Sequence, residues 1–178
     1  MRTPGERFAG LLDFPFSPRY CELEGLRLAH LDEGDGPPVL LVHAEPTWSF
    51  LWRTVLPPLR DAGYRCVVPD HAGFGRSDKP TDIGWYSYDR HTANLRALVE
   101  ERDLRGATVV VHDWGGPIAS PRRSVVTRPR WSRAPATSST EIPIATRQPA
   151  PAQARAVARL IPRAAPVMAT TRPSRLRG

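Results

Sequence analysis

Three segments of the chain are almost continuously apolar and are bounded by turn residues. They span residues 38–43, 65–68 and 108–111. A strand that is covered on both faces has no polar face, so we predict that these segments are buried strands. Residues 19–24 and 26–32 differ, because apolar and polar positions alternate on either side of Gly25. This second pattern predicts an antiparallel hairpin with one wet face.

Two further segments carry apolar residues at helical spacing. Residues 49–62 form the first and stop at Gly63, a residue typical of helix C-termini, and residues 87–102 form the second. Strands and helices that alternate in this way are joined by crossover connections. The sequence therefore predicts the α/β class, with a mostly parallel sheet.

The loops after the predicted strands are where we expect chemistry, because open α/β sheets bind ligands at the carboxyl ends of their strands. The third loop belongs to the sequence VVVHDWGG, residues 109–116. A strand that turns sharply into a helix through paired glycines has the form of a nucleophile elbow. The side chain at its tip is Asp113. Gly115 and Gly116 are expected there because a Cβ would collide where the chain doubles back.

An aspartate at this position selects the reaction. A carboxylate attacks esters poorly, but it can displace a leaving group from a saturated carbon and form an alkyl ester that water must then cleave. The backbone N–H groups of Glu45, in the first loop, and of Trp114 would form an oxyanion hole for the second step. The indole N–H of Trp114 is a donor only and could also hold a departing halide. An aspartate before glycines can equally be a plain turn or helix cap, so the neighbouring loops must decide.

The three loops together resemble those of haloalkane dehalogenases. HAEPTW, PDHAGFGRSDKP and VHDWGGP stand here in order, where the family usually has HGEPTW, PDxxGFGRSDKP and QDWGGP. The resemblance covers roughly residues 10–118 and implies an α/β-hydrolase fold. It implies Asp113 as nucleophile, Glu45 and Trp114 as backbone donors, and Trp114 as a halide-binding residue. By the same resemblance Asp70 shapes the second loop, and the reactants are a small halogenated alkane and water, with no cofactor and no metal.

Two positions depart from the family pattern. Ala44 replaces a glycine, and His112 replaces the usual glutamine. Epoxide hydrolases, a related family with an aspartate nucleophile, often have histidine at the second position, so they are the alternative. The EPTW and GGP sequences favour the dehalogenase. Epoxide opening also needs two tyrosines from a cap, whereas this sequence has no tyrosine beyond Tyr88.

The later part of a hydrolase's machinery is missing from these residues. In α/β-hydrolases the acid and the histidine base follow the nucleophile. All five histidines precede Asp113, and Glu141 is the one carboxylate after it. We interpret His43, His91 and His112 as structural histidines. The expected fold is thus an incomplete α/β-hydrolase. We expect the chain to form one trapped ester at most and not to turn over. The hypothesis from another class is a non-catalytic remnant without function.

Residues 119–178 have a composition of their own. They are rich in Arg, Pro and Ala and carry a net charge of +11, against −4 for residues 1–118. We predict a partial α/β-hydrolase domain at 1–118 and a disordered tail at 119–178. The tail has no lysine and no aromatic residue except Trp131, which argues against a nucleic-acid-binding arm. If the codons end in G or C, residues 120–131 can be read in another frame as an amphipathic helix that ends in His-Pro. Our hypothesis is therefore that the segment from residue 119 onward is translated out of frame.

The remaining observations concern the cellular setting. Cys21 and Cys66 are isolated in strand contexts, which favours buried free thiols over a disulfide. No apolar run approaches the roughly 20 residues of a membrane span, and the first residues lack the apolar core of a signal peptide. We expect a cytoplasmic monomer that binds neither nucleic acid nor membranes.

Asp78 and Lys79 are expected to be a solvated turn pair.

Overall fold

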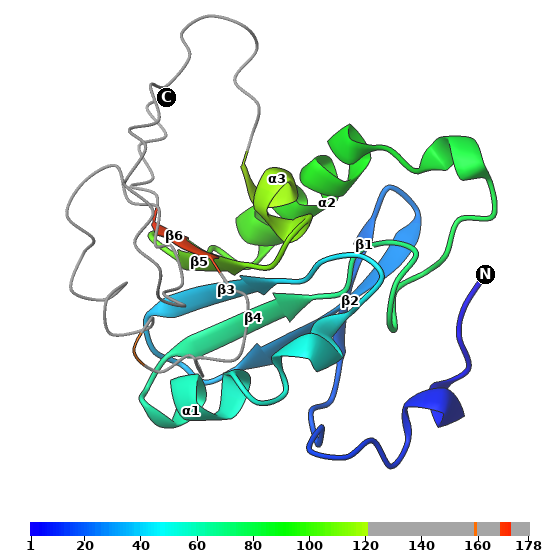
Figure 1. Ribbon diagram of the computed structural model, residues 1–178. Helices are drawn as coiled ribbons and strands as arrows, with labels where there is room; N and C mark the ends of the chain where they lie inside the picture. The colour runs from blue at the N-terminus through cyan, green and yellow to red at the C-terminus, as the bar shows by residue number, and fades with distance from the viewer. Residues whose placement is uncertain (121–158, 160–167, 172–178) are drawn as a thin grey trace, which may run out of the picture.

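The computed structural model describes residues 1–120, 159 and 168–171 (Figure 1). Its strands are β1 (Arg19–Leu23), β2 (Leu26–Glu33), β3 (Pro38–Val42), β4 (Arg65–Pro69), β5 (Thr108–Val111) and β6 (Met168–Thr171). The α-helices are α1 (Leu56–Asp61), α2 (Tyr88–Glu101) and α3 (Gly115–Ala119), and the 3-10 helices are η1 (Gly5–Phe8), η2 (Ser49–Trp52) and η3 (Ile83–Trp85). Most of the tail predicted to be disordered, with Trp131 and Glu141, lies outside the described residues.

The strands form one mixed sheet in the order β1-β2-β4-β3-β5-β6. Strand β3 is parallel to β4 and to β5, whereas the other pairings are antiparallel, so the sheet is mixed and not mostly parallel as predicted. The predicted hairpin is confirmed, and its turn residues Glu24 and Gly25 have φ values of 51° and 76°, the positive pair that a type I′ turn requires. The single wet face holds for β1 only. Strand β2 lies inside the sheet between β1 and β4 and is buried on both faces, because Leu31 packs in one hydrophobic layer and Leu28 in the other.

Strand β6 was not expected from the sequence. It pairs antiparallel with β5 from Thr108↔Thr171 to Val111↔Met168 and so lies beside the strand that precedes the predicted elbow (Figure 1). Its sequence, MATT, contains two β-branched threonines but is too short for an alternating pattern to be recognised. The prediction that residues 119–178 are disordered was therefore wrong at these four residues.

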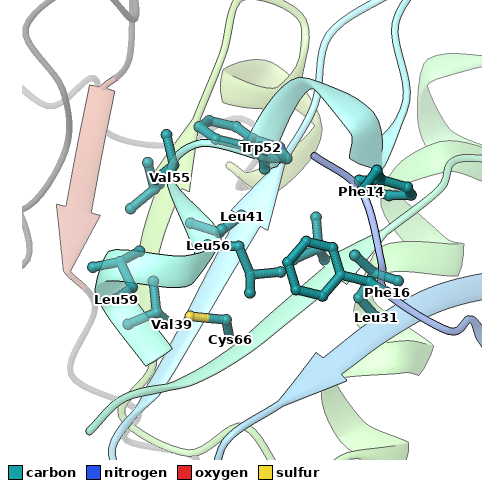
Figure 2. Packing of buried hydrophobic residues seen from close by; sticks show 12 residues of the cluster. Phe14, Phe16, Leu31, Val39, Leu41, Trp52, Val55, Leu56, Leu59 and Cys66 are labelled. Carbon is teal, nitrogen blue, oxygen red and sulfur yellow. The ribbon is translucent and has the colours of Figure 1, made fainter. Parts of the chain in front are cut away.

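Hydrophobic layers cover both faces of the sheet. Alternate residues of β3 separate into the two layers: Val39 and Leu41 face α1 and the N-terminal segment, whereas Leu40 and Val42 face α2 and α3. Figure 2 shows the first layer, in which side chains from α1, η2 and the N-terminal segment pack onto the sheet. This division confirms that β3, as predicted from its continuous apolar run, is covered on both faces.

The helix predicted over residues 49–62 is broken in the structure. It consists of η2 and the short helix α1, with Pro57 and Pro58 in the first turn of α1. Prolines lack the N–H that would continue a helix from the preceding turn, so the second helix starts anew. Its predicted end is confirmed, because Gly63 has φ of 85° and the N–H of Tyr64 donates to the Leu59 carbonyl, which is the Schellman arrangement.

Helix α2 begins where the sequence predicts, with Ser87 as the N-cap whose hydroxyl accepts a hydrogen bond from the Arg90 N–H. Both cysteines are buried free thiols, as expected. In contrast, the prediction for Asp78 was wrong. Its carboxylate is buried and accepts from the Arg2 guanidinium and the Arg27 N–H, partners too distant in sequence to be anticipated. Among the described residues, no helix is long and apolar enough to cross a membrane.

Candidate active site

Three loops meet at the carboxyl ends of the parallel strands. The loop after β3 is joined to the loop after β4 by two hydrogen bonds: Ser49 N–H to Asp70 Oδ1 at 2.7 Å, and His71 N–H to His43 Nε2 at 3.0 Å. The loop after β5 is joined to the end of β3 through the His112 N–H, which donates to the Val42 carbonyl at 3.1 Å. The structure thus brings the three sequence motifs together at one edge of the sheet.

The turn after β5 has the backbone of a strained, tight bend. Asp113 has φ of +44°, a region that non-glycine residues rarely occupy. The carbonyls of His112 and Asp113 accept from the N–H groups of Gly115 and Gly116, at 2.9 and 2.8 Å, and helix α3 begins at once. The Asp113 side chain is exposed at this edge of the sheet.

Gly115 is required by a close approach to β3. A Cβ at this position would lie 2.6 Å from the Val42 carbonyl oxygen and 2.9 Å from that of His43. Both are backbone atoms that cannot swing away, so the expectation of a collision is met at Gly115. The elbow can therefore lie directly beside the loop that carries Glu45.

The two backbone donors predicted from the sequence are not consumed by other contacts. Within residues 1–120, neither the N–H of Glu45 nor that of Trp114 donates a hydrogen bond. Trp114 is the residue before α3, and 52% of it is exposed. This large residue is thus exposed next to Asp113.

A group of buried histidines lies behind these loops. His43 and His71 have ring centroids 4.3 Å apart, and the His91 ring follows at 5.6 Å from His71. Burial lowers the pKa of all three rings, although the Glu45 carboxylate partly opposes this effect at His91. Neutral rings packed together agree with the structural interpretation of His43 and His91. The Nδ1 atom of His112 is also buried and has no partner among the described residues.

Asp70 connects the first two loops. One carboxylate oxygen accepts from Ser49 N–H and the other accepts from Arg76 N–H at 2.9 Å, while the backbone carbonyl accepts from the Ser77 hydroxyl at 2.6 Å. A Cβ on Gly75 would lie 2.4 Å from this carboxylate. Asp70 therefore shapes the second loop as the resemblance implies, and it also holds the first loop.

The site has the form of an acyl- or alkyl-transfer centre. It offers an exposed carboxylate on a bend, two backbone N–H groups without a partner within residues 1–120, and an exposed tryptophan beside them. In the part of the chain that the structure describes, no group of three or more His, Cys, Asp or Glu residues could hold a metal ion. Sequence reasoning missed the contacts of His43 and His71, which join residues 28 positions apart.

Comparisons with known proteins agree with this architecture. Residues 37–120 match the family model of the alpha/beta hydrolase fold. A haloalkane dehalogenase of Mycobacterium marinum is 48% identical over 125 residues, which are 66% of this chain and 42% of that protein. The chain therefore spans about two fifths of the length of the curated relatives it matches.

Solved structures lead to the same group of proteins. The tetrameric haloalkane dehalogenase of Paraglaciecola agarilytica has 46% identity and a TM-score of 0.63, covering 65% of this chain and 41% of that one. An epoxide hydrolase of Vigna radiata has 30% identity and a TM-score of 0.55, covering 58% and 33%. The first two thirds of this chain thus have the α/β-hydrolase fold and are similar in sequence to haloalkane dehalogenases, which are hydrolases.

Proposed function

We propose that this chain carries the alkylation site of a haloalkane dehalogenase, with Asp113 as the nucleophile and a small halogenated alkane as the substrate. The observation that supports this most strongly is the positive φ of Asp113, an exposed carboxylate on a bend beside the Glu45 loop. A plain helix cap would place its side chain on the helix N–H groups. No side-chain hydrogen bond caps α3.

The first step is a displacement at saturated carbon. An oxygen of the Asp113 carboxylate forms a bond to the carbon that carries the halogen, and the carbon–halogen bond breaks with both electrons leaving on the halide. The Trp114 indole N–H would hold the departing halide. The indole nitrogen is a donor only, so it would not compete with Asp113 for the electrophilic carbon. The product is an alkyl ester on the enzyme.

The second step needs a base, and no histidine follows Asp113 in these 178 residues. Water must attack the ester carbonyl, and the negative charge that forms there would be held by the N–H groups of Glu45 and Trp114. Three histidines near the site, at positions 43, 71 and 91, are poor substitutes. Both ring nitrogens of His43 are occupied, and burial lowers the pKa of His71 and His91. We therefore expect the ester to accumulate.

The test combines bromide release with intact-protein mass measurement. The purified chain is incubated with 1-bromobutane; one equivalent of bromide and one butyl adduct on Asp113 are expected. The control is Asp113→Asn, which keeps the side-chain shape and tolerates a positive φ, and it should give neither product. Sustained bromide release would contradict the missing base, and the absence of any adduct from the unsubstituted chain would contradict the proposed nucleophile.

Epoxide opening is the second candidate, because His112 precedes the aspartate and an epoxide hydrolase is among the similar structures. The lower identity of that structure, 30% against 46%, favours the dehalogenase. Incubation with styrene oxide distinguishes the two. A hydroxyalkyl adduct that forms faster than the butyl adduct would reverse this preference.

The hypothesis of a non-catalytic remnant makes a different prediction about folding. A chain with two hydrophobic layers on one sheet should unfold in a single cooperative transition. Circular dichroism during heating measures this directly. A gradual change without a transition would support the remnant.

A further inference from the structure

The peptide unit between Ala44 and Glu45 is held by an unusual number of hydrogen bonds. The Ala44 carbonyl lies within hydrogen-bond distance of three donor atoms: the Thr47 N–H at 3.1 Å, the Thr47 hydroxyl at 2.9 Å and Nδ1 of His43 at 2.7 Å. The other end of this same peptide is the N–H of Glu45. Because a peptide unit is planar, fixing the carbonyl direction also fixes the direction of the N–H.

The structure determines which ring nitrogen of His43 carries the proton. Nε2 receives a hydrogen bond from the backbone N–H of His71, and a backbone amide can only donate. Nε2 is therefore unprotonated, and a neutral ring must carry its proton on Nδ1, which donates to the Ala44 carbonyl. The side chain is fully buried, with the His71 ring beside it. These contacts leave His43 one orientation and one tautomer.

We propose that His43 and Thr47 are positioning residues that aim the Glu45 N–H at the Asp113 carboxyl group and strengthen it as a hydrogen-bond donor. A carbonyl that accepts several hydrogen bonds polarises its peptide unit, so the N–H at the other end carries more positive charge. The Glu45 N–H itself has no partner within residues 1–120. This inference rests on the proposed function, in which that N–H belongs to the oxyanion hole.

The two chemical steps respond differently to this arrangement. During alkylation, negative charge leaves the Asp113 carboxylate, so a weaker donor at Glu45 does not slow the step. During cleavage of the ester, negative charge develops on the carbonyl oxygen, so a weaker donor raises the barrier. A loss of folding would slow both steps, which distinguishes a positioning role from a merely structural one.

Hydroxylamine makes the second step measurable in a chain without a base. The ester is first formed with 1-bromobutane, and excess reagent is removed. The hydroxylamine nitrogen then bonds to the ester carbonyl, the carbon–oxygen bond to butanol breaks, and butanol leaves with a proton. An aspartyl hydroxamate remains on the enzyme, and intact-protein mass measurement follows the loss of the butyl adduct.

The decisive variant is Thr47→Val, which removes the hydroxyl but keeps the backbone N–H and the side-chain shape. Loss of a whole oxyanion donor costs about 10²–10³ in rate, so the loss of one of three supporting bonds should slow ester cleavage about three- to tenfold. Alkylation should proceed at the unsubstituted rate. Thr47→Ser should restore cleavage, and Thr81→Val, on an exposed turn, controls for the exchange itself.

The outcomes separate this inference from the proposed function. Absence of the butyl adduct in the unsubstituted chain overturns the proposed function. Formation of the adduct with unchanged cleavage in Thr47→Val, or with both steps slowed, overturns the positioning role. Nuclear magnetic resonance supplies a readout without chemistry: the ring ¹⁵N shifts should identify the Nδ1–H tautomer of His43, and Thr47→Val should move the Glu45 amide proton upfield. The Nε2–H tautomer, or an unmoved amide proton, would contradict the arrangement.

Discussion

The stability of this chain should depend on pH through His30, a residue far from the proposed chemistry. His30 lies in β2 and is 1% exposed, and neither ring nitrogen has a hydrogen-bond partner among the described residues. Burial lowers its pKa to about 4 from 6.5, and the positive charges of Arg102, Arg19 and Arg65 act in the same direction. Asp32 opposes the effect only in part. The folded chain therefore resists a proton that the unfolded chain accepts.

The sign and size of the effect follow from this difference. Above pH 6.5 the ring is neutral in both states, so the full stability is present. As the pH falls below 6.5 the unfolded chain binds the proton first, and stability is lost until the folded chain also binds it near pH 4. At about 1.4 kcal/mol per pKa unit, the contribution is about 2 kcal/mol between pH 8 and pH 5, and about 3 kcal/mol at lower pH.

The measurement is urea unfolding at pH 8 and pH 5, followed by tryptophan fluorescence, for the unsubstituted chain and for His30→Leu. The variant removes the titrating ring and its two unpartnered nitrogens. At pH 8 it should be at least as stable, because buried polar atoms without partners are costly. Its loss of stability from pH 8 to pH 5 should be about 2 kcal/mol smaller. An equal loss in both proteins would refute the reasoning.

Two further substitutions test the fold around the site and its support. Gly115→Ala should destabilise the chain by about 3 kcal/mol or more and abolish the butyl adduct, because the new Cβ would lie 2.6 Å from the Val42 carbonyl oxygen. Urea unfolding measures the stability, and a value equal to that of the unsubstituted chain would contradict this prediction. Arg65→Met should cost about 2 kcal/mol, since it leaves the buried Asp32 carboxylate without its two 2.7 Å hydrogen bonds. The thermal midpoint measures that loss, and an unchanged midpoint would show that the ion pair contributes nothing.

Local sequence patterns were enough for the strands that carry the site. The run that forms β3 contains no polar residue from Val39 to Val42, which is the pattern of a strand covered on both faces. The burial of β2 could not be predicted in this way, since its place inside the sheet, under both hydrophobic layers, depends on residues such as those of β4 that lie more than 30 positions later. Pro57 and Pro58 did carry the signal that breaks the predicted helix.

In the candidate site, too, local sequence predicts some features, whereas contacts between distant residues could not be predicted. Asp113 and Gly115 were identified from a contiguous motif, and the bend at Asp113 follows from local backbone geometry. The contact between His71 and His43 joins two different loops, so no spacing within either loop reveals it. The hydroxyl of Thr47 donates to the carbonyl of Ala44, three residues earlier. Turn-forming residues often make such local hydrogen bonds, so the sequence did contain this signal.

The close passage of Gly115 against β3 separates what the site does from what it selects. Gly115, which follows Trp114, lies so close to the carbonyls of Val42 and His43 that not even a methyl group fits between the two main-chain segments. The spacing of the two amides that we propose for the oxyanion is therefore set by the main chain and not by the side chains that would surround a substrate. Substitutions in that lining can alter size or polarity while the spacing of the amides stays constant, so such a scaffold can acquire new electrophiles without rebuilding its reactive centre.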